Sequence, residues 1–99
     1  MKRVDLIFTN VSGTYVSQPI EMLSSSFILH VSLSAIGTVQ IKHSAEKTPS
    51  QWNYIKDSGG VDDLVLDVLT YEEFSFTDGK FGLWVSIELS VEGQATMLL

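Results

Sequence analysis

The sequence predicts an all-β protein, an antiparallel β-sandwich or small barrel of eight to nine short strands that forms one domain over residues 1–99. Apolar and polar residues alternate with period two along residues 27–33 and 81–91, which is the pattern of strands with one buried face. Turn signals recur about every ten residues, as in sandwiches and small barrels. Helix signals are nearly absent, and the length suffices for one domain but not for two.

The first quarter of the chain predicts two strands joined by a turn. Apolar side chains alternate over residues 4–8 and predict a first strand, and residues 10–13 predict a turn. Residues 15–22 predict a second strand. Because Pro19 lacks a backbone donor, this strand is expected at a sheet edge or with a bulge. A polar connector follows at residues 23–26.

Residues 27–43 predict a β-hairpin around which the rest of the chain is organised. Its three-residue loop, residues 35–37, places Gly37 in the left-handed conformation that glycine adopts at little cost. With this loop, Leu33 lies opposite Val39 and the apolar residues of both strands share one face. The two strands are therefore expected to be neighbours in one sheet.

The middle of the chain predicts shorter elements. Residues 44–51 form a loop, residues 52–56 a short strand and residues 57–60 a turn. Residues 64–71 are rich in Val and Leu and predict another strand, with a helical turn before it as the alternative.

The C-terminal part predicts a second hairpin and a last strand. An Asp-Gly pair at residues 78–79 lies between alternating apolar runs, which is a strong signal for a two-residue hairpin turn. This turn sets Phe76 opposite Phe81. Residues 95–99 form the last strand. The strand over residues 81–91 is expected to point these side chains inward: Leu83, Val85, Ile87, Leu89 and Val91.

The net charge of −6 is unevenly spread. Residues 1–56 carry five basic and three acidic residues (+2), and residues 57–99 carry one basic and nine acidic residues (−8). Phosphate contacts need clustered Lys and Arg, so no nucleic-acid partner is expected. No run reaches the roughly 18 apolar residues of a membrane span, so no membrane partner is expected. The N-terminus lacks the apolar h-region of a signal peptide, which predicts a mature start.

No constellation of residues predicts catalysis, and the chain is expected not to be an enzyme and to need no cofactor or metal. The hairpin register places His30 beside Lys42 on the outer face and His43 beside Leu29 on the inner face. The two histidines therefore cannot share a metal or a proton relay. There is no Gly-x-Ser-x-Gly elbow and no cysteine. Calcium binding by four aspartates is an alternative to a solvated acidic turn, although their spacing does not match the twelve-residue calcium loop: Asp57, Asp62, Asp63 and Asp67.

Trp84 is the most informative side chain for function. It lies in mid-strand on a face that is otherwise polar, where a subunit or partner interface, burial under a loop, or stacking on a sugar would each account for it. We expect a homodimer or homotrimer whose interface includes Trp84 and its strand neighbours Ser86 and Glu88. Ile28, another apolar residue on a polar face, is included in the same predicted interface.

Four stretches carry a resemblance to a known class of proteins. They are Ser-Phe-Ile-Leu-His-Val-Ser at residues 26–32, Gly-Thr-Val-Gln-Ile-Lys-His-Ser at residues 37–44, Trp52, and Phe-Gly-Leu-Trp-Val-Ser-Ile at residues 81–87. Together they resemble small β-sandwich structural proteins of tailed bacteriophages, such as jelly-roll capsid decoration (cement) proteins. The chain departs from that pattern in two places. Residues 46–51 replace a shorter Asp-Gly turn before the tryptophan, and Trp84 replaces a basic residue.

The resemblance implies that the fold is a jelly-roll-like antiparallel β-sandwich and that the chain is a non-catalytic virion structural protein. On this hypothesis the chain is a decoration protein that oligomerises, binds the surface of the major capsid protein, and is found in the virion after synthesis in the host cytoplasm. The alternative is a carbohydrate-binding or tail-fibre or baseplate β-sandwich module, with Trp84 or Trp52 as the stacking platform.

Overall fold

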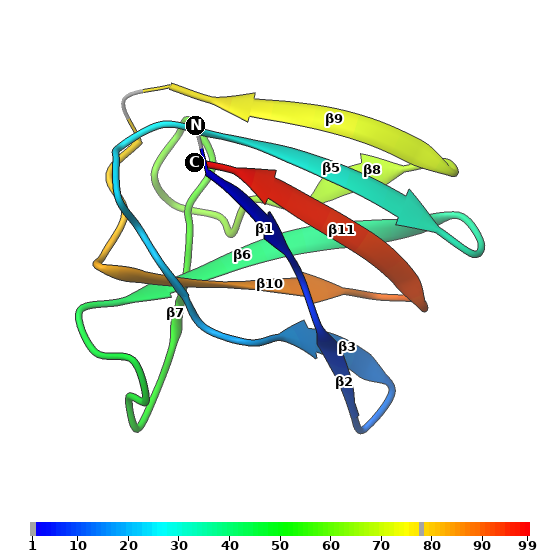
Figure 1. The fold of residues 1–99 in the computed structure, drawn as a ribbon, viewed down its shortest axis with the longest axis horizontal. Coiled ribbons are helices and arrows are strands. Elements are labelled where there is room, and N and C mark those ends of the chain that lie inside the picture. The colour runs from blue at the N-terminus through cyan, green and yellow to red at the C-terminus, as the bar shows by residue number, and fades with distance from the viewer. Residues whose placement is uncertain (1, 78) are drawn as a thin grey trace.

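The computed structural model describes residues 2–77 and 79–99 and confirms the all-β prediction, because these residues form two antiparallel sheets and no helix (Figure 1). They contain eleven strands rather than eight to nine, since some predicted strands are divided. The strands are β1 Arg3–Asp5, β2 Phe8–Val11, β3 Thr14–Ser17, β4 Ile20–Glu21, β5 Phe27–Leu33, β6 Gly37–Ser44, β7 Asn53–Tyr54, β8 Leu66–Val68, β9 Tyr71–Phe76, β10 Trp84–Leu89 and β11 Gly93–Leu98.

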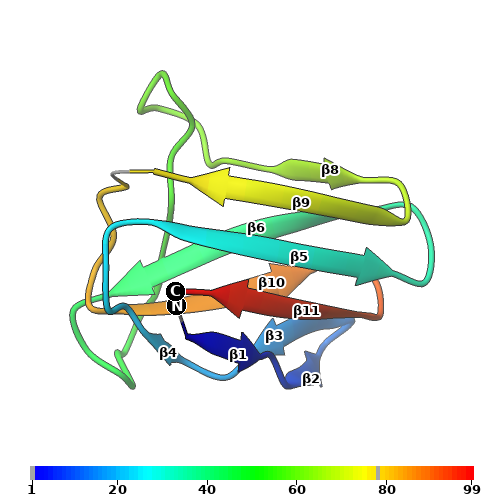
Figure 2. The same ribbon diagram turned by 45° about the horizontal axis from the view of Figure 1, so that its top comes forward.

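The two sheets lie face to face. Sheet A has the strand order β1-β11-β5-β9, and Figure 2 shows these four strands as one layer in front of β10 and β6. Sheet B has the order β2-β3-β10-β6-β7, with β4 also paired to β10 and β8 also paired to β6.

The connectivity is that of a jelly roll. Strands pair in a nested fashion, β1 with β11, β3 and β4 with β10, β5 with β9, and β6 with β7 and β8. Along the chain, β5, β6, β9, β10 and β11 alternate between sheets A and B. Nested antiparallel pairs rolled into two layers are the hallmark of this architecture. The predicted jelly-roll-like sandwich is therefore confirmed.

The core lies between the inner faces of the two sheets. Most of its side chains are fully buried, and burying one side chain of this size stabilises the fold by roughly 1.5–3 kcal/mol. Its members come from both layers: Phe27, Leu29, Val31, Leu33, Ala95 and Met97 from sheet A, and Ile20, Val39, Ile41, Val68, Val85, Ile87 and Leu89 from sheet B.

The hairpin predicted over residues 27–43 is wrong, although both of its strands are present. β5 pairs with β11 and β9, whereas β6 pairs with β10 in the other sheet. The intervening loop crosses between layers, so the apolar rows of β5 and β6 meet across the core instead of side by side. Gly37 does not have a positive φ. Glycine suits this position because a Cβ would lie 2.7 Å from Ser90 Oγ and 2.8 Å from Val91 Cγ2.

The second predicted hairpin is also wrong. β9 belongs to sheet A and β10 to sheet B, and Asp78 of the predicted turn lies outside the described residues. Phe76 and Phe81 nevertheless meet, with ring centroids 6.2 Å apart, and both rings contact Phe27 at one end of the core. Leu83 is 62% exposed instead of inward, because β10 begins only at Trp84.

The first predicted strand is divided between the two sheets. β1 pairs with β11 in sheet A, and β2 pairs with β3 in sheet B. The side chain of Gln18 holds the point of crossing, where its Oε1 accepts from Ile7 N at 2.8 Å and its Nε2 donates to Asp5 O at 3.2 Å. The apolar residues of both halves still pack against the core, as their alternation predicts.

The β2–β3 turn confirms the prediction for residues 10–13. Ser12 and Gly13 both have positive φ (53° and 92°), and Asn10 Oδ1 accepts from Gly13 N at 2.9 Å. Two positive φ values in a two-residue loop match the twist of a β-hairpin.

Of the two settings predicted for Pro19, a sheet edge or a bulge, the structure shows a bulge. From Val16 to Ile20 the chain advances four residues, whereas their partners on β10, Glu88 and Val85, are three residues apart. One extra residue therefore opposes β10, as in a β-bulge.

The nested topology can be tested with a disulfide, since the chain has no cysteine. His30 on β5 lies directly opposite Glu73 on β9. Further along the same ladder, Leu33 N donates to Thr70 O, so these two residues are a hydrogen-bonded pair. Hydrogen-bonded and non-hydrogen-bonded pairs alternate along an antiparallel ladder. His30 and Glu73 are therefore a non-hydrogen-bonded pair, whose closely spaced Cα atoms suit a disulfide. We expect His30→Cys with Glu73→Cys to oxidise to an intramolecular disulfide, measured by thiol titration.

The matched control is His30→Cys with Lys42→Cys, the pair that a local hairpin would place side by side. It should retain two free thiols in the native protein, because Lys42 lies in sheet B. Efficient oxidation of this control would contradict the topology.

Candidate functional site

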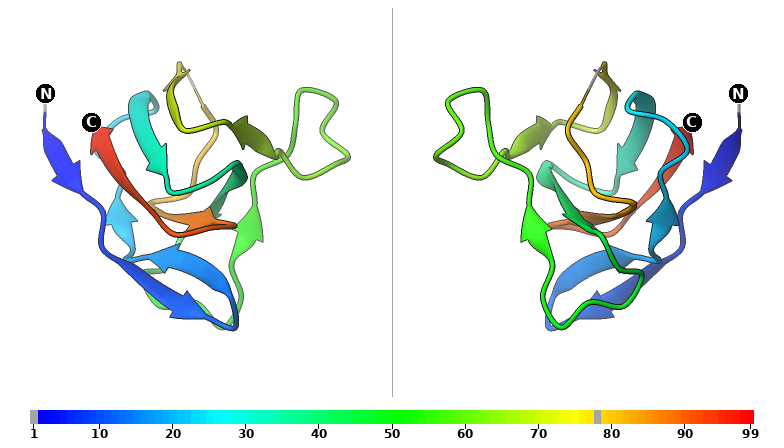
Figure 3. Two further views of the ribbon diagram at one scale, coloured as in Figure 1. Left: turned by 90° about the vertical axis from the view of Figure 1, so that its right-hand side faces the viewer. Right: turned by 90° about the vertical axis from the view of Figure 1, so that its left-hand side faces the viewer.

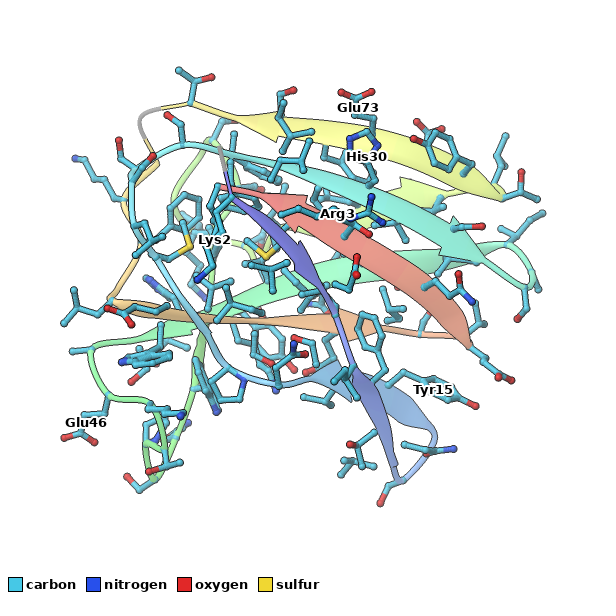
Figure 4. The ribbon with its side chains drawn as sticks, viewed as in Figure 1. Lys2, Arg3, Tyr15, His30, Glu46 and Glu73 are labelled. Atoms are coloured by element: carbon cyan, nitrogen blue, oxygen red, sulfur yellow. The ribbon has the colours of Figure 1, made fainter. Side chains whose placement is uncertain are left out.

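Trp84 lies on the outer face of sheet B and is partly buried. Its strand neighbours are Ser44 on β6 and Glu21 on β4. Lys47, from the loop after β6, places its Nζ 5.4 Å from the centre of the Trp84 ring, a cation–π contact. Glu46 of the same loop points away from the molecule (Figure 4). The loop thus contacts the ring while leaving part of it accessible.

Ser86 and Glu88 share this face of β10 but are engaged within the protein. Ser86 is 2% exposed, and its Oγ donates to Ser17 O at 3.0 Å. Ile87 N donates to Ser17 Oγ at 2.8 Å. The hydroxyl of each serine is therefore bonded to the backbone of the other strand, next to the bulge. These bonds give Ser86 a structural role at the centre of sheet B.

Glu88 accepts two bonds from other strands of sheet B. Its Oε1 accepts from the Tyr54 hydroxyl of β7 at 2.8 Å, and its Oε2 lies 2.9 Å from Lys42 Nζ of β6. The side chains of Lys42 and Glu88 are only 13% and 14% exposed, although they lie on an outer face. Burial, the hydrogen bond to Glu88 and the negative charges of Glu88 and Asp63 raise the pKa of Tyr54 to about 12.

Ile28 lies on the outer face of sheet A, beside Leu98 of β11 and Ser75 of β9. Trp84, Ser86 and Glu88 lie on the outer face of sheet B, so the four predicted interface residues do not form one surface. That any of them contacts a partner stays a prediction. Sequence reasoning missed Lys42 and Tyr54, because only the pairing of β6 with β7 and β10 brings them to Glu88.

The two histidines lie on opposite faces, as predicted, but with different neighbours. His30 is opposite Glu73, and its Nδ1 lies 2.7 Å from the Tyr71 hydroxyl (Figure 4 shows His30 and Glu73 on the outer face of sheet A). It is not beside Lys42, which belongs to the other sheet. His43 is opposite Val85 rather than Leu29, and its Nδ1 accepts from Gly82 N at 3.0 Å.

The acidic stretch forms a loop that projects from the edge of the sandwich (Figure 3). Asp63 pairs with Lys56, and Asp57 Oδ1 accepts from Gly59 N at 3.0 Å. Asp67 lies on β8, opposite Thr38 of β6. Within residues 2–77 and 79–99, no three His, Asp or Glu side chains come together as a set of metal ligands.

A cleft of about 420 Å³ opens between the edges of the two sheets. Phe76 and Phe81 line it on one side, and Ile55 and Leu64 line it on the other. Two lysines, Lys56 and Lys80, also border the cleft. The cleft is mostly apolar, so it offers surface for an apolar side chain.

Comparison of the chain with protein-family models, with curated proteins and with solved structures finds no match. Among the described residues, no helix has the length and apolar character required to cross a bilayer.

The raised pKa of Tyr54 has a measurable consequence. The folded protein holds this phenol proton more tightly than the unfolded chain, whose tyrosines titrate near pH 10. The contribution of Tyr54 to stability should therefore be complete below pH 10 and decline as the pH rises toward about 12. Phenolate absorbance should show a late transition that Tyr54→Phe removes.

Glu88→Gln separates the causes of this shift. Because burial is the largest cause, the variant should lower the pKa of Tyr54 only in part. A return to the ordinary tyrosine value would show that the charge and hydrogen bond of Glu88, and not burial, dominate.

Proposed function

We propose that the chain is a non-catalytic bacteriophage virion structural protein, a capsid decoration (cement) protein that forms a homodimer or homotrimer and binds the major capsid protein. The outer face of sheet B carries the proposal. There, Trp84 is partly accessible beside a polar network in which Lys42 and Tyr54 both bond Glu88.

The physical chemistry of this face suits protein association. Tryptophan is enriched among the residues that contribute most to binding, and such residues lie within a polar surround. The polar groups beside Trp84 are already hydrogen-bonded or ion-paired in the free protein. They would therefore keep their partners when association removes water from this face. Their side chains are also ordered beforehand, which reduces the entropy lost on binding.

Fold and charge add weaker support. Jelly rolls include viral capsid domains, but this is an analogy, since a fold hosts many functions. The −8 charge of residues 57–99 favours contact with a basic partner surface. On this proposal the protein is made in the host cytoplasm and resides in the virion.

A carbohydrate-binding or tail-fibre or baseplate module is the second candidate. The observation that favours it is the same accessible part of Trp84, because aromatic rings stack on sugars and jelly rolls also include lectin domains. Lys47 already lies over the Trp84 ring, so a sugar would have to use the remaining ring surface or displace this side chain.

The proposal predicts the abundance of the protein in purified particles. A decoration protein should be present in many copies, in a constant ratio to the major capsid protein, as quantitative mass spectrometry of intact virions would measure. A few copies per particle would favour a fibre or baseplate module, and absence from particles would contradict a virion role.

Trp84→Ala tests the surface itself. Truncating a tryptophan at an interface centre costs about 2 kcal/mol or more, which raises the dissociation constant roughly thirtyfold. Sedimentation velocity over a concentration series should show this weakening, whereas Ile36→Ala, at an exposed apolar residue of the β5–β6 loop, should leave association unchanged. A wild-type protein that stays monomeric at high micromolar concentration would end the homo-oligomer proposal.

A further inference from the structure

β9 is an edge strand with free backbone hydrogen-bonding groups. It pairs with β5 and with no other strand among the described residues, and it lies outermost in its layer (Figures 1 and 2). Leu33 N donates to Thr70 O at 2.8 Å, which sets the phase of the β5–β9 ladder. Hydrogen-bonded and non-hydrogen-bonded pairs alternate in such a ladder. The N–H and C=O groups of Tyr71, Glu73 and Ser75 therefore point away from β5, toward the open edge.

The other edges offer less to a partner. β9 has six residues, whereas β1 has three, β2 four, β7 two and β8 three. The edge of β1 is also partly occupied, because Gln18 binds the backbone of Asp5 and Ile7. Exposed edges in native proteins are usually short, charged or covered. β9 is the longest of these edges.

The side chains of β9 define what would fit beside it. Glu73 lies on the outer face, and Glu72 lies on the inner face opposite Val31. Phe74 and Phe76 are also on the inner face and are only partly buried, and Phe76 borders the cleft. An added strand would therefore meet apolar surface at one end of β9 and two carboxylates toward the other.

We propose that β9 is a docking site for an extended segment of a partner protein that adds antiparallel to sheet A, with apolar residues beside Phe74 and Phe76 and two consecutive basic residues beside Glu73 and Glu72. Backbone hydrogen bonds supply affinity in this mode, and alternate side chains supply specificity. The apolar residue beside Phe76 enters the cleft. The basic residues lie away from the cleft, where Lys56 and Lys80 would repel them.

Charge argues against a second copy of this chain as the occupant. Two β9 strands paired antiparallel around Glu73 would bring carboxylates of both copies together, and like charges directly opposite each other destabilise a strand pair. The same carboxylates attract a basic segment. This site is separate from the Trp84 surface, and it does not depend on the partner being a capsid protein.

The probe is the peptide acetyl-Val-Thr-Val-Lys-Lys-Thr-amide, whose residues in antiparallel register lie beside residues 76 to 71 in turn. Amide NMR of the isolated protein should show saturable shifts and slowed hydrogen exchange at Tyr71, Glu73 and Ser75. The acidic analogue acetyl-Val-Thr-Val-Glu-Glu-Thr-amide should bind at least about tenfold more weakly, because two attractive pairs become repulsive.

Two variants assign the binding to the edge. Ser75→Pro removes an N–H that faces the partner and not β5, so it should abolish binding while the rest of the spectrum persists. Glu73→Lys should weaken the basic peptide about fivefold. Glu92→Lys reverses an exposed charge in the β10–β11 turn and should not weaken binding of the basic peptide. It changes the net charge as much as Glu73→Lys does, but it lies away from β9.

Three outcomes would overturn the proposal. The first is the absence of shifts at the three amides with millimolar basic peptide. The second is equal weakening by Glu73→Lys and Glu92→Lys, which would reduce the effect to net charge. The third is perturbation of the same amides on simple concentration of the protein, which would assign the edge to a second copy. If Ser75→Pro fails to fold, the comparison of Glu73→Lys with Glu92→Lys still tests whether the peptide binds at β9.

Discussion

The packing of the β5 apolar row against the opposite sheet is the constraint on which the rest of the structure depends. Leu29 and Val31 have no exposed surface, and they are covered by β6 and β10 from the other layer. A strand neighbour within the same sheet would extend the apolar face without covering it. The next strand, β6, therefore enters the opposite sheet, and β5 has its in-sheet partners, β9 and β11, far along the sequence. The nested pairing follows from covering this row on a chain of 99 residues.

The same arrangement decides the character of the outer faces. In sheet B, the alternation that turns Val85 and Ile87 inward turns Ser86 and Glu88 outward. There, Ser86 donates to the backbone oxygen of Ser17, and Glu88 accepts from the side chains of Tyr54 and Lys42. On this outer face Ser86 is buried, and Glu88 is held by two side-chain partners. Trp84 ends this row at the start of β10 and remains partly accessible, so it is the part of the row with surface left for a partner.

Sheet A presents a different kind of surface. Its distinctive feature is the unpaired backbone of β9, which differs chemically from an aromatic patch. Trp84 offers apolar area that any complementary face can cover, whereas an edge accepts only an extended chain in register. Glu72 and Glu73 oppose self-pairing of this edge and favour a basic segment. A protein that uses both surfaces would contact two elements of its surroundings without either contact obstructing the other, because the two lie on different sheets.

The class of fold and the inward and outward faces of most strands could be predicted from local patterns in the sequence. Period-two alternation identified β5 and β6 and placed Leu29, Val39 and Ile41 in the core, and Pro19 indicated the bulge, because these signals are local properties of the backbone and its side chains. Local signals do not state which strands pair. The loop before Gly37 and the Asp-Gly pair at residues 78–79 predicted hairpins, yet both connections cross between layers. Likewise, the bonding of Tyr54 and Lys42 to Glu88 depends on strands far apart in the sequence. These features are set by the tertiary fold. Strand pairing depends on covering both apolar faces at once, which involves the whole chain and cannot be read from the sequence of one turn.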